Sequence, residues 1–247
     1  MTKIAIIIPS RLDAQRLPNK PLKLIGKKEM ILHVHDLAIE TNLGEVIVAT
    51  PDKKVFDLVK KHGGKSFMTN INHQTGTDRI YEVFEKKFNK KIDIVVNLQG
   101  DMPNLNPTAI INLVKHLQNN TCDIATLASR FEADKEFNDK NICKVVTSKE
   151  ITRGKFNRAL DFYREPKNNE INLTYHHIGI YAFTNKALIR YVGLKRSRLE
   201  IERKLEQLRA LENNMKIDVG YIDACPLSVD TEEDLIEIKK IMESNNE

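Results

Sequence analysis

The sequence predicts an α/β fold in which strands and helices alternate around a mostly parallel sheet. The apolar, β-branched run at residues 4–9 is typical of a strand that is buried on both faces. Further runs of this kind alternate with segments whose apolar residues recur at helical spacing. Repeated strand–helix–strand units require right-handed crossovers, so the strands they connect are expected to run parallel.

The first half of the chain shows this alternation clearly. We predict strands at residues 4–9, 45–50, 66–69 and 92–98, and helices at residues 30–39, 53–62 and 77–88. The Gly63-Gly64 pair is expected to end the second of these helices, because glycine adopts the left-handed cap conformation at low cost.

The second half is less regular and predicts a smaller mixed-sheet insertion. Strands are expected at residues 124–129, 143–147, 177–183 and 216–222, and helices at residues 198–212 and 232–242. Residues 161–172 look like a polar connection that contains Pro166. Apolar residues at 183–194 suit either internal packing or contact with a second chain. No linker, repeat or low-complexity tract interrupts the sequence, which predicts a single domain over residues 1–247.

Composition excludes several classes of protein. The net charge of +5 is modest, and 39 lysines and arginines are dispersed among 34 acids, whereas a nucleic-acid-binding protein usually shows a denser basic stripe. The three cysteines, Cys122, Cys143 and Cys225, lack metal-ligand spacing and indicate a reducing compartment. The apolar run at the N-terminus is too short for a signal peptide, and no segment reaches transmembrane length. We therefore expect a cytoplasmic protein without a membrane span.

Three cations follow the first strand in a loop that contains several prolines: Arg11, Arg16 and Lys20. Prolines make a continuous helix there unfavourable, and open α/β sheets bind ligands at the carboxyl ends of their strands. The loop therefore predicts a site for a phosphate-rich ligand, although an ordinary solvated surface is the alternative in a chain that is 30% charged. Neither of the common glycine-rich phosphate-loop motifs follows the strand, which argues against a P-loop NTPase and against a dinucleotide-binding protein.

Two aspartates are candidate ligands for Mg²⁺. Asp101 follows the predicted strand at 92–98 and is expected at the same sheet edge as the basic loop, where a carboxylate can bind the ion, although it can equally begin a turn before Pro103. Thr231 and Asp234 are spaced as a helix cap, which leaves Asp230 available as a second carboxylate.

Other polar residues admit both a functional and a structural interpretation. Residues 73–79 combine Gln74, Gly76 and Arg79 at a helix start, which suits either a nucleotide or a capping motif with Thr77 as the N-cap. His177 begins a predicted strand and is either a ligand for a hydroxyl or carboxylate or a structural residue. On the predicted helix 198–212, one face is formed by Glu202, Glu206 and Arg209, which is typical of solvated ion pairs. The isolated histidines His33, His35 and His62 show no ligand spacing and are interpreted as structural.

These segments together resemble the 3-deoxy-manno-octulosonate (Kdo) cytidylyltransferases over nearly the whole chain. Residues 8–22 and 96–101 match cytidylyltransferases broadly, and residues 73–79 and 229–235 add to the match. His-Ile-Gly-Ile-Tyr at 177–181 and Leu-Glu-Gln-Leu-Arg at 205–209 make it specific to the Kdo enzymes. The resemblance implies a Rossmann-like nucleotide-diphospho-sugar transferase fold. It also implies a nucleotide-binding part at about residues 1–130 and a sugar-binding and dimerisation part at about residues 131–225.

The resemblance further implies transfer of CMP from CTP to the anomeric hydroxyl of Kdo, with release of pyrophosphate, in lipopolysaccharide synthesis. It implies Mg²⁺ as the cofactor, a homodimer, and no nucleic-acid or membrane partner. By this analogy the triphosphate is held by Arg11, Arg16 and Lys20, and the nucleotide lies near Gln74, Gly76 and Arg79. Mg²⁺ is bound by Asp101 and Asp230, which with Arg11 and Lys20 form the expected catalytic set. The sugar pocket is lined by Gln99, Arg164, His177, Tyr181, Glu206 and Gln207.

The chain departs from the family pattern at a few positions. Met102 replaces a usual Glu beside the expected metal site, so Mg²⁺ affinity is the property most affected; Ser228 replaces Gly, Glu233 replaces Pro, and Arg198 replaces a frequent Pro. The alternatives are a cytidylyltransferase for another acid sugar such as sialic acid, and a non-catalytic CTP-binding regulator. A glycosyltransferase of related fold would usually carry an Asp-x-Asp metal motif, which is absent from the sequence.

Overall fold

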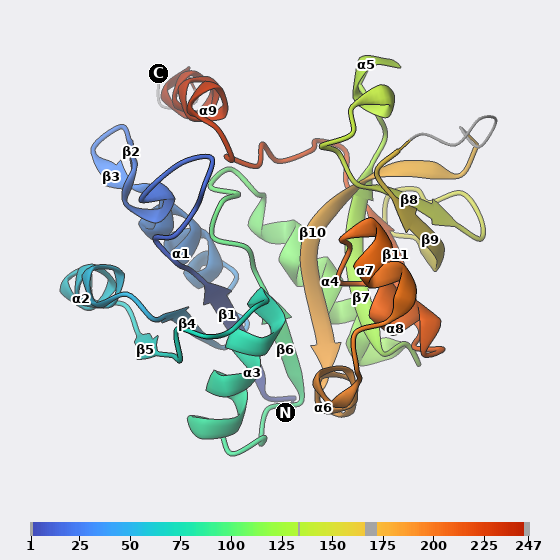
Figure 1. Cartoon of the computed structure of the whole chain (residues 1–247), viewed down its shortest axis with the longest axis horizontal. Coiled ribbons are helices and arrows are strands. Elements are labelled where there is room, and N and C mark those ends of the chain that lie inside the picture. The colour runs from blue at the N-terminus through green and yellow to red at the C-terminus, as the bar shows by residue number, and fades with distance from the viewer. Residues whose placement is uncertain (1, 133, 166–171, 245–247) are drawn as a thin grey trace. The chain divides into compact units, whose positions relative to one another are not determined.

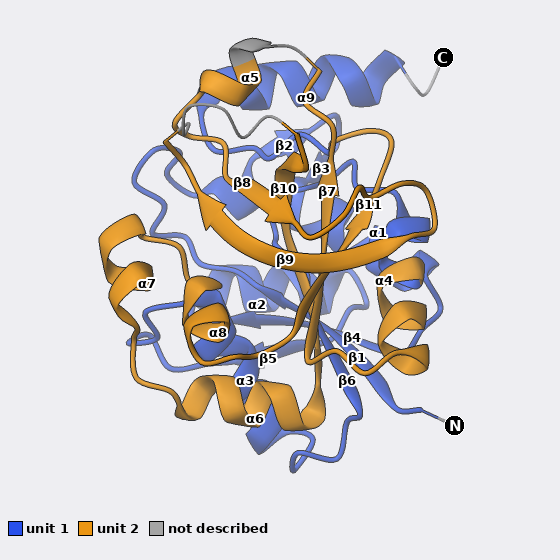
Figure 2. Ribbon diagram, turned by 90° about the vertical axis from the view of Figure 1, so that its right-hand side faces the viewer, with its two compact units in different colours: residues 1–111, 226–247 blue, residues 112–225 orange. Residues whose placement is uncertain are grey.

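The computed structural model describes residues 2–132, 134–165 and 172–244 (Figure 1). It divides into two compact units, of which the first joins residues 1–111 to residues 226–247 and the second comprises residues 112–225 (Figure 2). The C-terminal segment therefore belongs to the same unit as the first strand.

The first unit contains a parallel sheet with strand order β5-β4-β1-β6. These strands are β1 (Ile4–Pro9), β4 (Glu45–Thr50), β5 (Ser66–Met68) and β6 (Ile94–Asn97). Strand β1 pairs in parallel with both β4 and β6, so that Ile6 stands opposite Val46 on one side and Val96 on the other. Residues 5–8 of β1 are fully buried, which confirms the prediction of a strand covered on both faces.

Helices and short strands connect or follow the strands of this sheet. They are η1 (Lys20–Leu22), β2 (Leu24–Ile25), β3 (Lys28–Glu29), α1 (Met30–Glu40), α2 (Lys53–Lys61), α3 (Gly76–Lys86) and α9 (Glu232–Ser244), with α4 (Pro107–Asn119) at the boundary between the units. Gly63 follows α2 with a φ of +85°, the left-handed conformation expected there. Leu235 and Ile238 of α9 pack in one apolar cluster with Leu17 and Met30, which attaches the C-terminal helix to the loop after β1.

The caps of two helices test the sequence predictions. Helix α9 has the expected reciprocal cap: the Asp234 N–H donates to Thr231 Oγ1 at 3.2 Å, and the Thr231 N–H donates to Asp234 Oδ2 at 2.8 Å. The prediction that Thr77 caps α3 is wrong, because Thr75 Oγ1 accepts the Asp78 N–H at 3.1 Å. Thr77 lies inside the helix, is buried, and accepts a hydrogen bond from Asn97 Nδ2.

The second unit contains the expected mixed sheet, with strand order β10-β7-β11-β9-β8. These strands are β7 (Ile124–Ser129), β8 (Lys144–Thr147), β9 (Phe156–Tyr163), β10 (Thr174–Thr184) and β11 (Ile217–Tyr221). Only β7 and β11 among these strands pair in parallel, and the other pairs of the described sheet are antiparallel. The prediction of a connection from residue 161 was wrong at its start, because β9 continues to Tyr163; Pro166 lies outside the described residues.

The predicted single helix at 198–212 is wrong. The structure has α7 (Arg198–Arg203) and α8 (Leu208–Glu212), separated at Lys204, whose φ of +54° ends the first helix. A buried ion pair explains the break, since Glu200 of α7 accepts two hydrogen bonds from Arg209 of α8 at 2.6 and 2.8 Å. The expected common face of Glu202, Glu206 and Arg209 therefore does not exist.

Two shorter helices complete the second unit, α5 (Asp134–Asn138) and α6 (Asn185–Gly193). Helix α6 buries Ala187, Leu188 and Tyr191, so much of the apolar stretch at 183–194 packs internally. None of the helices in the described part of the chain is long and apolar enough to cross a membrane.

Candidate functional site

A cavity of about 590 Å³ opens in the first unit at the carboxyl end of β1. It is lined by the loop after β1, by the start of α3, by residues 99–101 after β6, and by Asp230. The structure thus brings together the basic loop, the 73–79 segment and both aspartates, which the sequence places far apart. A cavity of this size is typical of small-molecule sites.

The loop after β1 is fixed to the sheet by contacts that leave two of its cations in solvent. The Ser10 N–H donates to the carbonyl of Ala49 at 2.9 Å, and the Leu12 N–H donates to Asp52 Oδ2 at 2.8 Å. Leu17 is only 2% exposed and anchors the far end of the loop in the core. Arg11 and Arg16 remain exposed. The role of Asp52 was missed from the sequence, although a carboxylate just after a parallel strand was a signal for it.

Lys20 lies between the two aspartates. Its Nζ is 2.7 Å from Asp101 Oδ2 and 2.9 Å from Asp230 Oδ1. Burial alone would lower the pKa of Lys20, but the charges of the two carboxylates outweigh it and raise the pKa. The ammonium is therefore a permanent positive charge inside the cavity.

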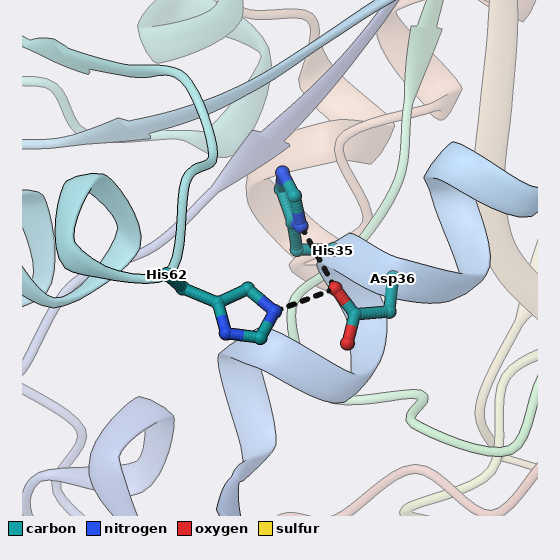
Figure 3. Close-up of side chains that lie close together, drawn as sticks. All are labelled: His35, Asp36 and His62. Carbon is teal, nitrogen blue, oxygen red and sulfur yellow. Dashed lines mark hydrogen bonds and ion pairs between the residues drawn. The ribbon is translucent and has the colours of Figure 1, made fainter.

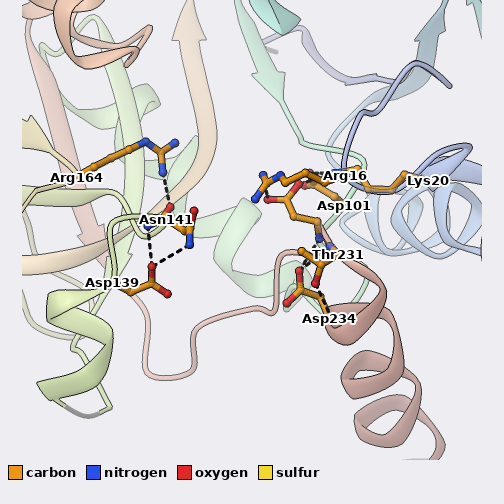
Figure 4. A network of polar contacts seen from close by, with 9 residues as sticks. Arg16, Lys20, Asp101, Asp139, Asn141, Arg164, Thr231 and Asp234 are labelled. Atoms are coloured by element: carbon orange, nitrogen blue, oxygen red, sulfur yellow. Dashed lines mark hydrogen bonds and ion pairs between the residues drawn. The ribbon is translucent and has the colours of Figure 1, made fainter.

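Backbone contacts hold the second aspartate at this position. The Val229 N–H donates to the carbonyl of Asp101 at 2.9 Å, which places Asp230 beside Asp101. Arg16 Nη2 lies 2.9 Å from Asp230 Oδ2, and Figure 4 shows Arg16 and Lys20 meeting the Asp101 region next to the cap of α9. The chain end therefore completes a cluster that begins with the first loop.

The donor set of this cluster fits a divalent cation. Two carboxylates, those of Asp101 and Asp230, lie close enough to contact one atom, Lys20 Nζ. Mg²⁺ prefers oxygen ligands and is commonly held by one or two carboxylates, with phosphates and water in its other positions. Asp101 and Asp230 are the residues that would hold such an ion here.

The segment at 73–79 combines ligand-facing and structural side chains. Gln74 is exposed and lines the cavity. Arg79 is 3% exposed, and its Nη1 donates to Thr69 Oγ1 and to the carbonyl of Asn70. Burial, and next the charge of Arg11, lower the pKa of Arg79. Arg79 thus lines the cavity and also holds the segment that follows β5.

Gly76 leaves space at the cavity wall. A Cβ placed on Gly76 would lie 3.4 Å from Pro9 Cγ, which is an ordinary contact. The packing of the described residues therefore does not require glycine at this position of the cavity wall.

Glu82, which sequence reasoning missed, fixes the conformation of residues 70–73. This buried carboxylate accepts hydrogen bonds from the Asn70 N–H at 2.8 Å, His73 Nε2 at 2.6 Å and Lys86 Nζ at 2.7 Å. Burial alone would raise the pKa of Glu82, but the hydrogen bonds, that of Lys86 first, lower it to about 2. The sequence offered only the helical spacing to Lys86 as a signal.

Of the predicted sugar-binding residues, Gln99 lies in the first unit and lines the cavity, where its Nε2 donates to Asn97 Oδ1 at 3.1 Å. The others belong to the second unit. The ring centroids of Tyr181 and His177 lie 5.5 Å apart. Burial, and next the neighbouring Cys143 and Glu206, raise the pKa of Tyr181 while Arg164 opposes them, so these groups lie close together. Gln207 joins them through a hydrogen bond from its Nε2 to Cys143 Sγ at 3.4 Å.

His177 is neutral in this structure. It is 7% exposed, and burial, followed by the charges of His176 and Arg164, lowers its pKa to about 3. Thr126 Oγ1 donates to the carbonyl of Ile180 at 2.7 Å and lies 3.0 Å from His177 Nε2. Because the Thr126 hydroxyl donates its proton to the carbonyl of Ile180, it can only accept from His177. His177 Nε2 therefore carries the proton of the imidazole, and Nδ1 is an acceptor.

Lys144 was not predicted from the sequence, yet it organises the surroundings of Arg164. Its side chain is fully buried, and its Nζ donates to the carbonyls of Asp139, Ile142 and Arg164, the last at 2.7 Å. Arg164 Nη1 in turn donates to the carbonyl of Asn141, as Figure 4 shows. A lysine inside an apolar strand sequence was the available signal.

Comparison with known proteins agrees with this geometry. The model of the cytidylyltransferase family matches residues 5–217 of the chain. The 3-deoxy-manno-octulosonate cytidylyltransferase of Bartonella bacilliformis is 43% identical over 241 residues, which cover 97% of this chain and 98% of that protein. The chain belongs to the 3-deoxy-manno-octulosonate cytidylyltransferase family. The protein of the same name from Brucella canis is also 43% identical, over 94% of this chain and 93% of its own.

Solved structures extend the comparison to the fold. The structure of a CMP:2-keto-3-deoxy-manno-octonic acid synthetase complexed with CTP superposes with a TM-score of 0.89, at 34% identity over 99% of this chain and 100% of that one. A 4-diphosphocytidyl-2C-methyl-D-erythritol synthase from Anaerococcus prevotii, at 14% identity over 98% of this chain and 99% of its own, shares the fold with a TM-score of 0.64. The Rossmann-like fold predicted for this member of the Kdo cytidylyltransferase family is confirmed.

Proposed function

We propose that this chain transfers CMP from CTP to the anomeric hydroxyl of Kdo and releases pyrophosphate, supplying an activated sugar for lipopolysaccharide synthesis. The observation that carries the proposal is the cluster of Lys20, Asp101 and Asp230 at the end of β1, in a chain that is 43% identical to named Kdo cytidylyltransferases. In this reaction the Kdo hydroxyl oxygen forms a bond to the α-phosphorus, and the bond from that phosphorus to the pyrophosphate oxygen breaks.

The basic loop suits the triphosphate. Arg11 and Arg16 are exposed at the cavity, and Lys20 supplies a third cation whose raised pKa keeps it charged. Fixed cations stabilise the charge that develops on the leaving pyrophosphate, and they cost no reorganisation during the reaction. This is the role we assign to Arg11, Arg16 and Lys20, while Gln74, Gly76 and Arg79 accommodate the nucleoside.

Mg²⁺ is the proposed cofactor, held by Asp101 and Asp230. When bound, such an ion polarises phosphoryl oxygens as a Lewis acid. Lys20 and Arg16 hold both carboxylates in place and limit their mutual repulsion. Met102, where the family usually has Glu, is 3% exposed and brings no charge to this cluster.

The remaining residues suit an acid sugar. The planar guanidinium of Arg164 matches the Kdo carboxylate as a bidentate partner. Within the second unit, the neutral His177, with Tyr181, Gln207 and Glu206, provides hydrogen bonds for hydroxyl groups. Gln99, the remaining residue predicted for the sugar, lines the cavity of the first unit. Orienting the anomeric hydroxyl towards the α-phosphorus contributes at most ~7–11 kcal/mol to lowering the barrier. We further propose that the enzyme acts as a homodimer in the cytoplasm.

Pyrophosphate release from CTP and Mg²⁺, with Kdo, with sialic acid and with neither, tests the proposal. Release that depends on Kdo alone is the expected result. Release with sialic acid alone would overturn the sugar assignment but keep the cytidylyltransferase reaction. CTP binding without release in either arm would favour the non-catalytic regulator. Gel filtration with light scattering tests the dimer.

A further inference from the structure

Two histidines and one aspartate that the proposed reaction does not use lie together in the first unit. His35 and Asp36 belong to α1, and His62 immediately follows α2 (Figure 3). His35 Nδ1 is 3.1 Å from Asp36 Oδ1, and His62 Nε2 is 2.9 Å from the same oxygen. The two histidines are far apart in the sequence, which is why their spacing carried no signal.

The distances within this cluster are close to those of a tetrahedral metal site. The three donor atoms lie within 4.8 Å of one another. In a tetrahedral zinc site with bonds of about 2.0–2.1 Å, neighbouring ligand atoms lie roughly 3.3 Å apart. The two contacts of Asp36 Oδ1 differ from this value by a few tenths of an ångström. With three protein ligands, a fourth position is left for water.

The surroundings of the cluster fix the orientation of two of its ligands. His35 is 5% exposed, and a Cβ on Gly64 would lie 2.6 Å from its Nε2, so the glycine allows the ring to occupy this position. The outer hydrogen bond that histidine ligands usually make is missing, because Nε2 has no partner among the described residues, so packing alone orients this ring. Lys28 Nζ binds Asp36 Oδ2 at 2.8 Å, which leaves Oδ1 facing both imidazoles.

Lys28 bears on the charge of the proposed site, because it pairs with the carboxylate of Asp36. Nearby Lys28 adds a positive charge that weakens cation binding, but it is 38% exposed and partly screened by solvent.

We propose that His35, Asp36 and His62 form a binding site for a borderline divalent transition-metal ion such as Zn²⁺, separate from the carboxylates Asp101 and Asp230. The donor set decides the class of ion, because imidazole nitrogen suits zinc and its neighbours whereas Mg²⁺ and Ca²⁺ prefer oxygen alone. The bound ion would link α1 to the end of α2. Binding requires each donor nitrogen to be the unprotonated one of its ring.

Calorimetric titration of the full chain with Zn²⁺, in saturating Mg²⁺, tests this proposal. We expect one Zn²⁺ per chain and a rise in melting temperature of roughly 5 °C at one hundred times the dissociation constant. His62→Ala should weaken binding at least about tenfold, and it should leave CMP transfer unchanged because His62 does not line the cavity. Co²⁺ as a spectroscopic probe should give visible tetrahedral absorption bands in the wild type and not in His62→Ala.

Two control variants make the outcome decisive. His33→Gln alters another histidine of α1, whose Nε2 contacts the carbonyl of Ile25, and Asp101→Asn alters the separate carboxylate cluster. Both should keep the wild-type affinity for Zn²⁺. Absence of Zn²⁺ binding by the wild type, equal binding by His62→Ala, or loss of binding in Asp101→Asn would each overturn the proposal. None of the measurements of Zn²⁺ binding depends on the proposed CMP transfer.

Discussion

The Nζ of Lys20 lies 2.7 Å from Asp101 and thereby ties the first loop of the chain to the end of β6. Asp230 contacts the same nitrogen at 2.9 Å. One ammonium therefore contacts two carboxylates that lie far apart in the sequence.

Asp101→Asn should reduce turnover by a factor on the order of 10²–10³. An uncharged amide is a weaker Mg²⁺ ligand than a carboxylate, and the ion is proposed to stabilise the charge that develops on the leaving pyrophosphate. Steady-state pyrophosphate release at saturating CTP and Kdo measures the effect. Asp223→Asn, which removes an exposed carboxylate paired with Arg153, is the matched control and should retain wild-type turnover. Normal turnover in Asp101→Asn would refute the metal assignment.

Lys20→Met should increase the rise in melting temperature that Mg²⁺ produces. Without the ammonium, Asp101 and Asp230 repel each other, and a divalent ion relieves this repulsion more than in the wild type. Melting temperatures with and without Mg²⁺ measure the response. An equal Mg²⁺ effect in both proteins would indicate that the ion does not bind between these carboxylates.

Gly76→Ala should leave the fold intact, because the added methyl group makes only an ordinary contact with Pro9. It should raise the KM for CTP, because the methyl group takes up space at the wall of the cavity proposed for the nucleotide. Urea unfolding and steady-state kinetics separate the two effects. If the KM for CTP and the free energy of unfolding both stay at wild-type values, the ligand does not approach this backbone.

Lys144→Met should destabilise the protein by about 1–3 kcal/mol per carbonyl left unsatisfied, and it should raise the KM for Kdo more than that for CTP. The reason is that Lys144 binds the carbonyl of Arg164 but does not line the cavity in the first unit. Equal increases in both KM values would mean that Lys144 acts only on overall stability.

The lowered pKa of Glu82 predicts that the free energy of unfolding decreases in acid. Its pKa is about 2 in the folded protein against an ordinary 4.5, so the folded state binds this proton more weakly than the unfolded state. The contribution is complete above about pH 4.5 and is lost as the pH falls towards 2; it is on the order of 2–3 kcal/mol. Urea unfolding at pH 6 and pH 3 should show a smaller pH effect in Glu82→Gln than in the wild type.

The sequence predicted best where a single pattern determines the structure. Strand β1 is a continuous β-branched run, and its burial between two strands followed from that run. The cap of α9 was equally local, since Thr231 and Asp234 are close in sequence.

Contacts between distant residues accounted for the errors. The Glu200–Arg209 ion pair requires a left-handed turn at Lys204, and the helical pattern of 198–212 gave no sign of it. The contact of His62 with Asp36 depends on how α2 packs against α1. In the candidate site, the aspartates were found from their positions after a strand and before a helix. Lys144 and Glu82 were missed because each has a backbone partner that no sequence pattern reveals, the carbonyl of Arg164 and the N–H of Asn70.

The hydrogen bond from the Val229 N–H to the carbonyl of Asp101 also has a consequence for synthesis on the ribosome. The loop after β1 is translated long before Asp230 and the α9 residues that pack against Leu17. A nascent chain therefore exposes Arg16 and Lys20 without their second carboxylate until residue 230 has emerged. Termination before residue 230 would leave a product that lacks this carboxylate, so nucleotide chemistry would be restricted to chains translated beyond it.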